Sequence, residues 1–200
     1  MFIVIEGLDG VGKTTLAKKL SNEIGATYLS TPSKTFSEIR QKIDDAYAHN
    51  QLARQLFYAS TVVDIADRVR QLLVEGRPVV VDRYWLSTMV YHNWKTEGKH
   101  FELSDVEKVL LVPDLTIYIE LSLSERNKRI NNRDINSRED QLTLNENAHF
   151  NLHSLYLQYL KGPLVGRSEK ITSEHDVDSM IKHLKHYVLT PMLLDNEQNN

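Results

Sequence analysis

The sequence has 200 residues and a mass of 23.1 kDa, the size of one globular domain. Hydrophobic residues make up 41% and charged residues 26%, which excludes a wholly disordered or collagen-like chain. The formal net charge of -3 provides no global positive field, so we expect no nucleic-acid polymer as a partner.

The absence of cysteine excludes disulfide scaffolds, thiolate zinc sites and thiol catalysis. The first residues lack the basic and apolar regions of a signal peptide, and no apolar run approaches the roughly 20 residues of a membrane span. We therefore expect a soluble protein without a membrane partner, located in the cytoplasm or in an organelle.

Short β-rich runs alternate along the chain with longer segments of helical periodicity. The expected strands cover residues 2–5, 27–29, 78–81, 115–121 and, more weakly, 170–172. The expected helices cover about residues 14–24, 36–48, 51–75, 105–110, 124–132, 145–160 and 176–188. Because parallel strands need crossover connections and bury both faces, this order predicts an α/β three-layer sandwich, a five-stranded parallel sheet with helices on both faces. We expect one domain over residues 1–190 and a polar C-terminal tail over residues 191–200, of which residues 195–200 should fray.

The first expected strand leads into a complete G-x-x-x-x-G-K-[ST] pattern. This spacing between a strand and a helix is that of a phosphate-binding P-loop, whose amides and helix end face anions. We expect ATP here, with Lys13 on its β- and γ-phosphates and the Thr14 hydroxyl on Mg²⁺. A glycine turn without function is the alternative. The residues expected to bind ATP in this loop are Gly7, Leu8, Asp9, Gly10, Val11, Gly12, Lys13, Thr14 and Thr15.

The third expected strand ends in a carboxylate and a guanidinium, Asp82 and Arg83. The carboxyl ends of parallel strands face the ligand crevice, so Asp82 is expected beside Mg²⁺. Arg83 is expected on a second phosphate group, as a catalytic residue together with Lys13. The alternative is a surface ion pair that follows an edge strand.

Residues 125–140 are rich in arginine, interrupted by Asn, Asp and Ser. Such a segment is typical of a mobile lid, here about residues 126–142, whose guanidinium groups close over transferring phosphate oxygens. Since the P-loop carries no arginine, we expect Arg133 and Arg138 to be catalytic, and Arg129 to lie over the adenine of ATP. The alternative is a solvated helix end.

Residues 2–15 closely resemble the opening of thymidylate kinases, and Asp82-Arg83-Tyr84 matches their strand-end triplet. Residues 56–59 resemble the helix that carries their base-stacking phenylalanine, and residues 113–118 the strand before their lid. The resemblance runs from Met1 to about Leu184. It implies transfer of the ATP γ-phosphate to a pyrimidine nucleoside monophosphate, first of all dTMP, and a homodimer. It implies base stacking by Phe57 and contact of Asp9 with the acceptor 3′-hydroxyl. The acceptor residues expected from it are Asp9, Arg40, Phe57, Thr61, Arg83, Tyr84 and Ser87.

Two departures bear on the acceptor. Family members usually have Arg-Glu-Pro-Gly-Gly-Thr after the second strand, where residues 29–34 here read Leu-Ser-Thr-Pro-Ser-Lys. They also place an arginine four positions after the stacking phenylalanine, where this chain has Thr61. Both features are closer to a divergent branch that includes the mitochondrial uridylate-cytidylate kinase. Kinases for dUMP, dCMP or a modified pyrimidine monophosphate are therefore alternatives.

Other P-loop functions are also open. A nucleoside kinase needs a carboxylate base near the end of the second strand, where residues 31–33 supply none and Glu38 lies farther along. A GTP switch needs Asn-Lys-x-Asp, and residues 131–134 lack the lysine. A catalytically degenerate P-loop protein remains an alternative because one acceptor-side arginine is replaced.

Several residues are expected to have structural roles only. We expect His149 and His153 to be surface residues, because no third metal ligand is near them in the sequence. Trp85 and Trp94 are expected to pack the helix after Arg83. Tyr156 is expected in the core or at the lid hinge.

Overall fold

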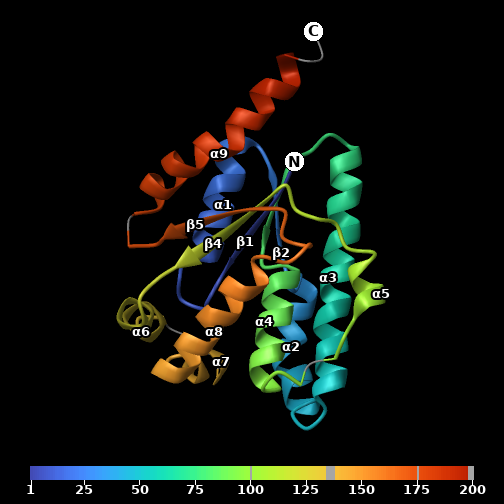
Figure 1. Cartoon of the computed structure of the whole chain (residues 1–200), viewed down its shortest axis with the longest axis vertical. Helices are drawn as coiled ribbons and strands as arrows, with labels where there is room; N and C mark the ends of the chain where they lie inside the picture. Colours follow the sequence, from blue (N-terminus) through green and yellow to red (C-terminus); the bar gives the residue numbers. More distant parts are fainter. Residues whose placement is uncertain (100, 134–137, 175, 198–200) are drawn as a thin grey trace.

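The structure is a computed structural model that describes residues 1–99, 101–133, 138–174 and 176–197, with only the backbone given for residues 37, 138, 139, 186 and 189–197. Five parallel strands form one sheet in the order β2-β3-β1-β4-β5 (Figure 1). This confirms the predicted α/β architecture. The strands are β1 (Phe2–Gly7), β2 (Thr27–Ser30), β3 (Val79–Asp82), β4 (Leu115–Glu120) and β5 (Arg167–Thr172).

The helices follow the predicted order, with two additions. They are α1 (Lys13–Ile24), α2 (Lys34–Ala46), α3 (Gln51–Val74), α4 (Trp85–Lys95), α5 (Ser104–Glu107), α6 (Leu123–Asn131), α7 (Arg138–Leu142), α8 (Glu146–Tyr159) and α9 (Val177–Glu197). A helix after Arg83 was expected without bounds, and α4 is missing from the predicted ranges because it packs between α3 and α8 and lacks a one-sided apolar pattern. The short α7 lies inside the predicted lid.

The last helix extends farther than predicted. We expected it to end near Val188, whereas α9 continues through Pro191 to Glu197. The spacing of four residues between the buried Leu184 and Val188 recurs at Met192, so the apolar helical period does not stop at residue 188. Residues 195–197 of the end expected to fray therefore have a helical backbone.

Alternate residues of β1 point to the two faces of the sheet. Ile3 and Ile5 belong to the core cluster that includes Leu16 and Leu20 of α1. Phe2 and Val4 belong to the cluster built with α3. Because successive side chains of a strand point to opposite faces, the sheet is covered by helices on both sides. Of the residues that the structure describes, no helix is both long and apolar enough to span a lipid bilayer.

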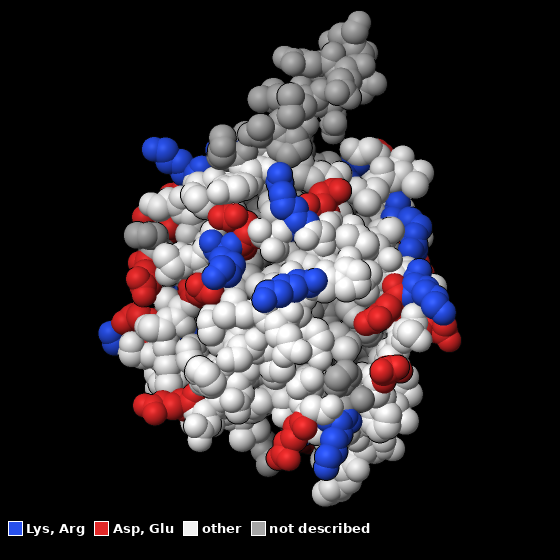
Figure 2. All heavy atoms as spheres, viewed as in Figure 1, with Lys and Arg blue, Asp and Glu red and all other residues white. Residues whose placement is uncertain are grey.

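The parallel strands bring distant segments to one edge of the sheet. The P-loop follows β1, Thr31 follows β2, Arg83 follows β3 and Ser173 follows β5. Ligands of open α/β sheets bind at this edge, outside the carboxyl ends of the strands. On the face seen in Figure 2, basic and acidic side chains of the described residues are interspersed, and neither sign forms one continuous patch.

Candidate active site

The P-loop adopts a backbone that only glycine enters easily. Gly12 caps α1 with φ of 96°, and Gly10 has φ of 86°. A Cβ atom on Gly10 would lie 2.9 Å from Cγ1 of Ile130, so its lack of a side chain lets α6 pack directly on the loop. Helix α6, which follows β4, therefore contacts the loop that is predicted to bind phosphate.

Lys13 lies buried inside the loop. Its Nζ donates a hydrogen bond to the Leu8 carbonyl oxygen at 2.7 Å and lies 3.9 Å from Oδ1 of Asp9. Burial and the nearby Arg83 lower the pKa of Lys13 to about 8, against the opposing effect of Asp9. The ammonium group of Lys13 is thus bound by the Leu8 carbonyl of the loop itself. In the predicted complex, the phosphates of ATP would take the place of this hydrogen bond.

Thr14 and Asp82 meet at the base of this loop. The Thr14 hydroxyl donates to Oδ2 of Asp82 at 2.5 Å, and Oδ1 of Asp82 is buried with no hydrogen-bond partner among the described residues. A hydroxyl and a carboxylate oxygen are ligands that Mg²⁺ prefers, and an orphaned carboxylate oxygen indicates a missing cation or donor. The two residues predicted to bind the metal therefore fit a Mg²⁺ ion. Because β3 is an interior strand, the edge-strand alternative for Asp82 and Arg83 is wrong.

Asp9 and Arg83 form a partly buried ion pair through Oδ1 and Nη2. The Tyr91 hydroxyl donates to Oδ2 of Asp9 at 2.7 Å. Burial would raise the pKa of Asp9, but the charges of Arg83 and Lys13 outweigh it and hold this pKa well below its usual range. Asp9 is thus a permanent carboxylate with occupied oxygens, which makes it a poor general base.

A buried network fixes the position of Arg83. Its backbone has φ of 68°, a conformation that costs a non-glycine residue of order 1–3 kcal/mol and is common at functional sites. Its Nη1 donates to Oγ of Ser87 at 2.9 Å, and the Tyr156 hydroxyl lies 2.9 Å from the same Oγ. Glu6 accepts from Ser87 Oγ and from the Tyr84 amide at 2.9 Å. The fully buried Glu6 escaped sequence analysis, although an acidic residue in an apolar strand was a signal for it.

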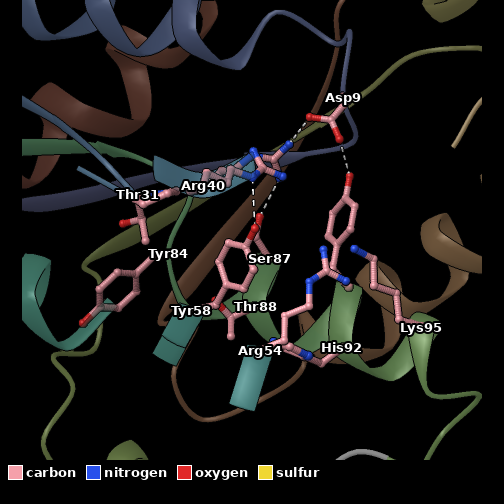
Figure 3. A pocket seen from close by; sticks show the side chains of 13 residues that line it. Asp9, Thr31, Arg40, Arg54, Tyr58, Tyr84, Ser87, Thr88, His92 and Lys95 are labelled. Atoms are coloured by element: carbon pink, nitrogen blue, oxygen red, sulfur yellow. Dashed lines mark hydrogen bonds and ion pairs between the residues drawn. The ribbon is translucent and has the colours of Figure 1, made fainter. Parts of the chain in front are cut away.

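Asp9 and Arg83 line two cavities. One is the P-loop cavity around Lys13 and Thr14. The other, here called the second pocket, lies between the P-loop, α3 and α4. Figure 3 shows Asp9 at one end of this pocket and Arg54 and His92 at the other. The residues that line it are Asp9, Thr31, Pro32, Arg40, Arg54, Tyr58, Arg83, Tyr84, Ser87, Thr88, Tyr91, His92 and Lys95. The structure thus brings together five of the seven predicted acceptor residues, namely Asp9, Arg40, Arg83, Tyr84 and Ser87.

Phe57 and Thr61 are not among the residues that line this pocket. The Phe57 ring packs against Phe36 and Tyr58, with centroid distances of 6.1 and 5.3 Å. Thr61 is fully buried, and its hydroxyl donates to the Tyr58 carbonyl at 2.8 Å. The phase of α3 instead turns the residue pair 54 and 58, four apart, toward the pocket.

Tyr58 and Arg54 are the pocket residues that sequence analysis missed on α3. The Tyr58 hydroxyl accepts from Nε of Arg40 and donates to Asp44, both at 3.0 Å. Arg54 Nε lies 2.7 Å from Oδ1 of Asp44. The arginine-tyrosine spacing of one helical turn was present in the sequence, but only the fold shows which turn of the helix faces the pocket.

The arginines of the predicted lid differ in what they contact. Arg133 lines the P-loop cavity with Lys13, Thr14 and Asp82, and its Nη1 lies 3.7 Å from Oδ1 of Asp140. Arg129 Nη1 donates to Ser173 Oγ at 2.6 Å, next to the expected ATP site. Arg138 begins α7, and its side chain lies outside the described atoms, as do residues 134–137 of the lid.

The two histidines of α8 are partly buried and make contacts that the sequence analysis did not predict. His149 is half-buried and its Nδ1 lies 2.8 Å from Nη1 of Arg126. His153 Nδ1 lies 3.0 Å from the Tyr118 hydroxyl. Both partners come from other segments, which is why spacing within α8 did not reveal them.

Tyr156 is fully buried and Trp85 is a core residue, as predicted.

The comparisons by sequence point to one family. Residues 5–163 match the family model described as thymidylate kinase. A probable thymidylate kinase of Methanococcus aeolicus is 33% identical over 136 residues, which cover 66% of this chain and 67% of that protein. A probable thymidylate kinase of Thermococcus onnurineus is 29% identical over 92% of this chain and 98% of its own length.

Solved structures with the same fold are more distant in sequence. A thymidylate kinase from Candida albicans superposes with a TM-score of 0.72 at 20% identity, covering 96% of this chain and 92% of its own. A deoxyadenosine kinase from M. mycoides gives a TM-score of 0.70 at 19% identity, covering 95% of this chain and 100% of its own. At these identities the likeness confirms the fold.

Proposed function

The chain belongs to the thymidylate kinase family, and we propose that it transfers the γ-phosphate of ATP to dTMP. Family membership makes it an ATP-dependent nucleoside monophosphate kinase. The choice of dTMP over other pyrimidine monophosphates rests on the family.

One observation carries the proposal. Asp9 and Arg83 line both the P-loop cavity, which contains Lys13, and the second pocket. An acceptor phosphate on Arg83 would therefore face the γ-phosphate of ATP bound by the P-loop. Such alignment of the reacting groups is the largest part of what phosphoryl transfer needs from a protein.

The reaction can proceed without a general base. An oxygen of the acceptor monophosphate, already ionised near neutral pH, attacks the γ-phosphorus and forms a new O–P bond. The bond between the γ-phosphorus and the bridging oxygen breaks, and ADP leaves with that electron pair. Lys13, Arg83 and Arg133 surround this place with positive charge, which opposes repulsion between the two anions.

Thr14 and Asp82 are the residues that would hold Mg²⁺, with Oδ1 of Asp82 as the available carboxylate oxygen. The bound ion neutralises charge on the ATP phosphates.

A nucleoside kinase is the second candidate, because it would use the same P-loop. It would need a free carboxylate near the acceptor hydroxyl. Among the described residues that line the pocket, Asp9 is the only carboxylate, and both of its oxygens are engaged by Arg83 and Tyr91. This supports a monophosphate acceptor.

We also propose a homodimer, as the family resemblance implies. The exposed apolar side chains Ile39 of α2 and Leu52 and Leu56 of α3 support a contact surface on these helices. Light scattering after size exclusion should give about twice the mass of one chain, and a monomeric mass would contradict this part of the proposal.

The acceptor is tested by initial rates with ATP and, in turn, dTMP, dUMP, dCMP and thymidine. We expect dTMP to give the highest kcat/KM and thymidine to stay at background. Faster turnover of thymidine than of dTMP would favour the nucleoside kinase, and turnover of none would favour a degenerate P-loop protein.

A further inference from the structure

Arg126 of α6 has a completely buried guanidinium group, with 0% relative exposure. Its Nε donates to the Asp9 carbonyl oxygen at 2.7 Å. Its Nη2 donates to Oγ1 of Thr143 at 2.9 Å, and its Nη1 donates to the Thr143 carbonyl at 3.2 Å. Among the described residues Arg126 has no carboxylate hydrogen-bond partner, and burying such a cation is costly, so these acceptors must be held closely in place.

The acceptors come from segments that are far apart in the chain. Asp9 belongs to the P-loop, Arg126 lies at the start of the lid, and Thr143 lies between α7 and α8 at its end. Thr143 is itself fully buried. One side chain therefore joins the two ends of the lid to each other and to the loop that binds ATP.

His149 completes the set from α8. An arginine can only donate, so Nδ1 of His149 accepts from Nη1 of Arg126 at 2.8 Å and its ring carries the proton on Nε2. The P-loop, the two lid ends and α8 are thus tied to one guanidinium group.

The contacts continue to a lid cation that faces the phosphate site. The Thr143 hydroxyl, which accepts from Arg126, donates to the Asp140 carbonyl at 2.9 Å. The Asp140 carboxylate lies 3.7 Å from Nη1 of Arg133, and Arg133 lines the P-loop cavity. The position of Arg133 therefore depends on a turn that Arg126 holds.

We propose that Arg126 is a positioning residue for phosphoryl transfer, which clamps the two ends of the lid to the Asp9 carbonyl and thereby sets Arg133 and Asp9 over the reacting phosphates. The inference rests on the proposed function for its kinetic part. A buried arginine with a purely structural role would change stability, whereas a positioning residue changes turnover in protein that is folded.

The test uses two variants and a matched control in the full-length protein. Arg126→Met removes every donor and keeps the length of the side chain, and Thr143→Val removes one acceptor in a nearly isosteric way. Lys128→Met is the control, since Lys128 lies on the same helix and pairs only with the exposed Glu125 in the described contacts. Each variant is assayed for kcat and KM per folded molecule and for hydrogen exchange of residues 138–149 and 7–12.

We expect Arg126→Met to lower kcat by about 10- to 100-fold, because small misplacements of reacting groups have effects of this size. The KM values for ATP and acceptor should change by less than about threefold. Thr143→Val should lower kcat by about 3- to 10-fold. The double variant should be no slower than Arg126→Met, since both substitutions break the same interaction between Arg126 and Thr143. Exchange should rise in both segments, and Lys128→Met should match the natural protein.

Natural kcat in folded Arg126→Met, or in Thr143→Val if the first variant does not fold, would overturn the proposal. So would multiplicative effects in the double variant. The exchange measurement does not require activity. If the natural protein failed to transfer phosphate, the proposed function would fall, while coupled exchange of the P-loop and lid ends would still report the clamp.

Discussion

The Thr14 hydroxyl donates a 2.5 Å hydrogen bond to Oδ2 of Asp82, and this contact joins the first turn of α1 to the end of β3. Within the part of the chain that the structure describes, Oδ1 of Asp82 is buried and has no hydrogen-bond partner. The pair thus places a hydroxyl oxygen and a carboxylate oxygen side by side, and this is the geometry on which the proposed Mg²⁺ site rests.

Asp82→Asn should therefore weaken metal use. The amide keeps the shape of the side chain but loses the charge that Mg²⁺ prefers. We expect the Mg²⁺ concentration for half-maximal activity to rise at least about tenfold. Asp67→Asn, which removes an exposed carboxylate from α3, is the matched control. An unchanged Mg²⁺ titration would show that Asp82 does not bind the metal.

The pH dependence of ATP use should report Lys13. With its pKa lowered to about 8, Lys13 is charged below this pH and loses its proton as the pH rises through it. Because kcat/KM for ATP reports groups of the free enzyme, it should fall on the alkaline side with an apparent pKa near this value. Lys13→Arg should lower activity but remove this alkaline limb, since arginine stays charged. A profile that stays flat to pH 10 in the natural protein would refute the assignment.

Arg133→Ala should lower kcat by about 100-fold and change the affinity for ATP little, as expected for a contact made chiefly in the transition state. The side chain is exposed and lines the P-loop cavity, so its loss should leave the fold intact. Arg70→Ala on the exposed side of α3 is the control for loss of a surface cation. Normal turnover of Arg133→Ala would place the catalytic cation elsewhere in the lid, with Arg138 as the next candidate.

The acceptor base should depend on Tyr58 more than on Phe57. Tyr58 lines the second pocket, which is the proposed acceptor site, whereas the Phe57 ring packs against Phe36. We expect Tyr58→Leu to raise the acceptor KM by about tenfold or more through lost stacking and hydrogen bonds, and Phe57→Leu to raise it less. A larger effect of Phe57→Leu, measured by initial rates at saturating ATP, would restore the phenylalanine as the stacking residue.

The sequence predicted those parts of the site that are encoded by local spacing. The P-loop follows from the position of Gly7, Gly12 and Lys13 between a strand and a helix, and Asp82 follows from the end of a buried apolar run. Parallel strands then place both at one edge of the sheet. These residues needed no knowledge of tertiary contacts.

The remaining residues depend on contacts between distant segments. Arg126 belongs to a charged stretch that favours a solvated lid, and its burial depends on acceptors from the P-loop and from Thr143. The choice between Phe57 and Tyr58 depends on the rotation of α3 about its axis. Two adjacent residues of one helix do not by themselves reveal this rotation. Helical periodicity could predict that the helix exists but not which turn faces the acceptor pocket.

Transfer of the ATP γ-phosphate to dTMP is tested most directly with ATP that carries ³²P in its γ-phosphate. The products are followed with dTMP as the acceptor, and the natural protein is compared with Lys13→Ala at equal concentration. The account predicts that the label appears in dTDP with the natural protein, and that the rate falls by about 10²- to 10⁴-fold in Lys13→Ala, because one charge is lost from the phosphate site. Label found only in inorganic phosphate, or equal dTDP formation by both proteins, would contradict it.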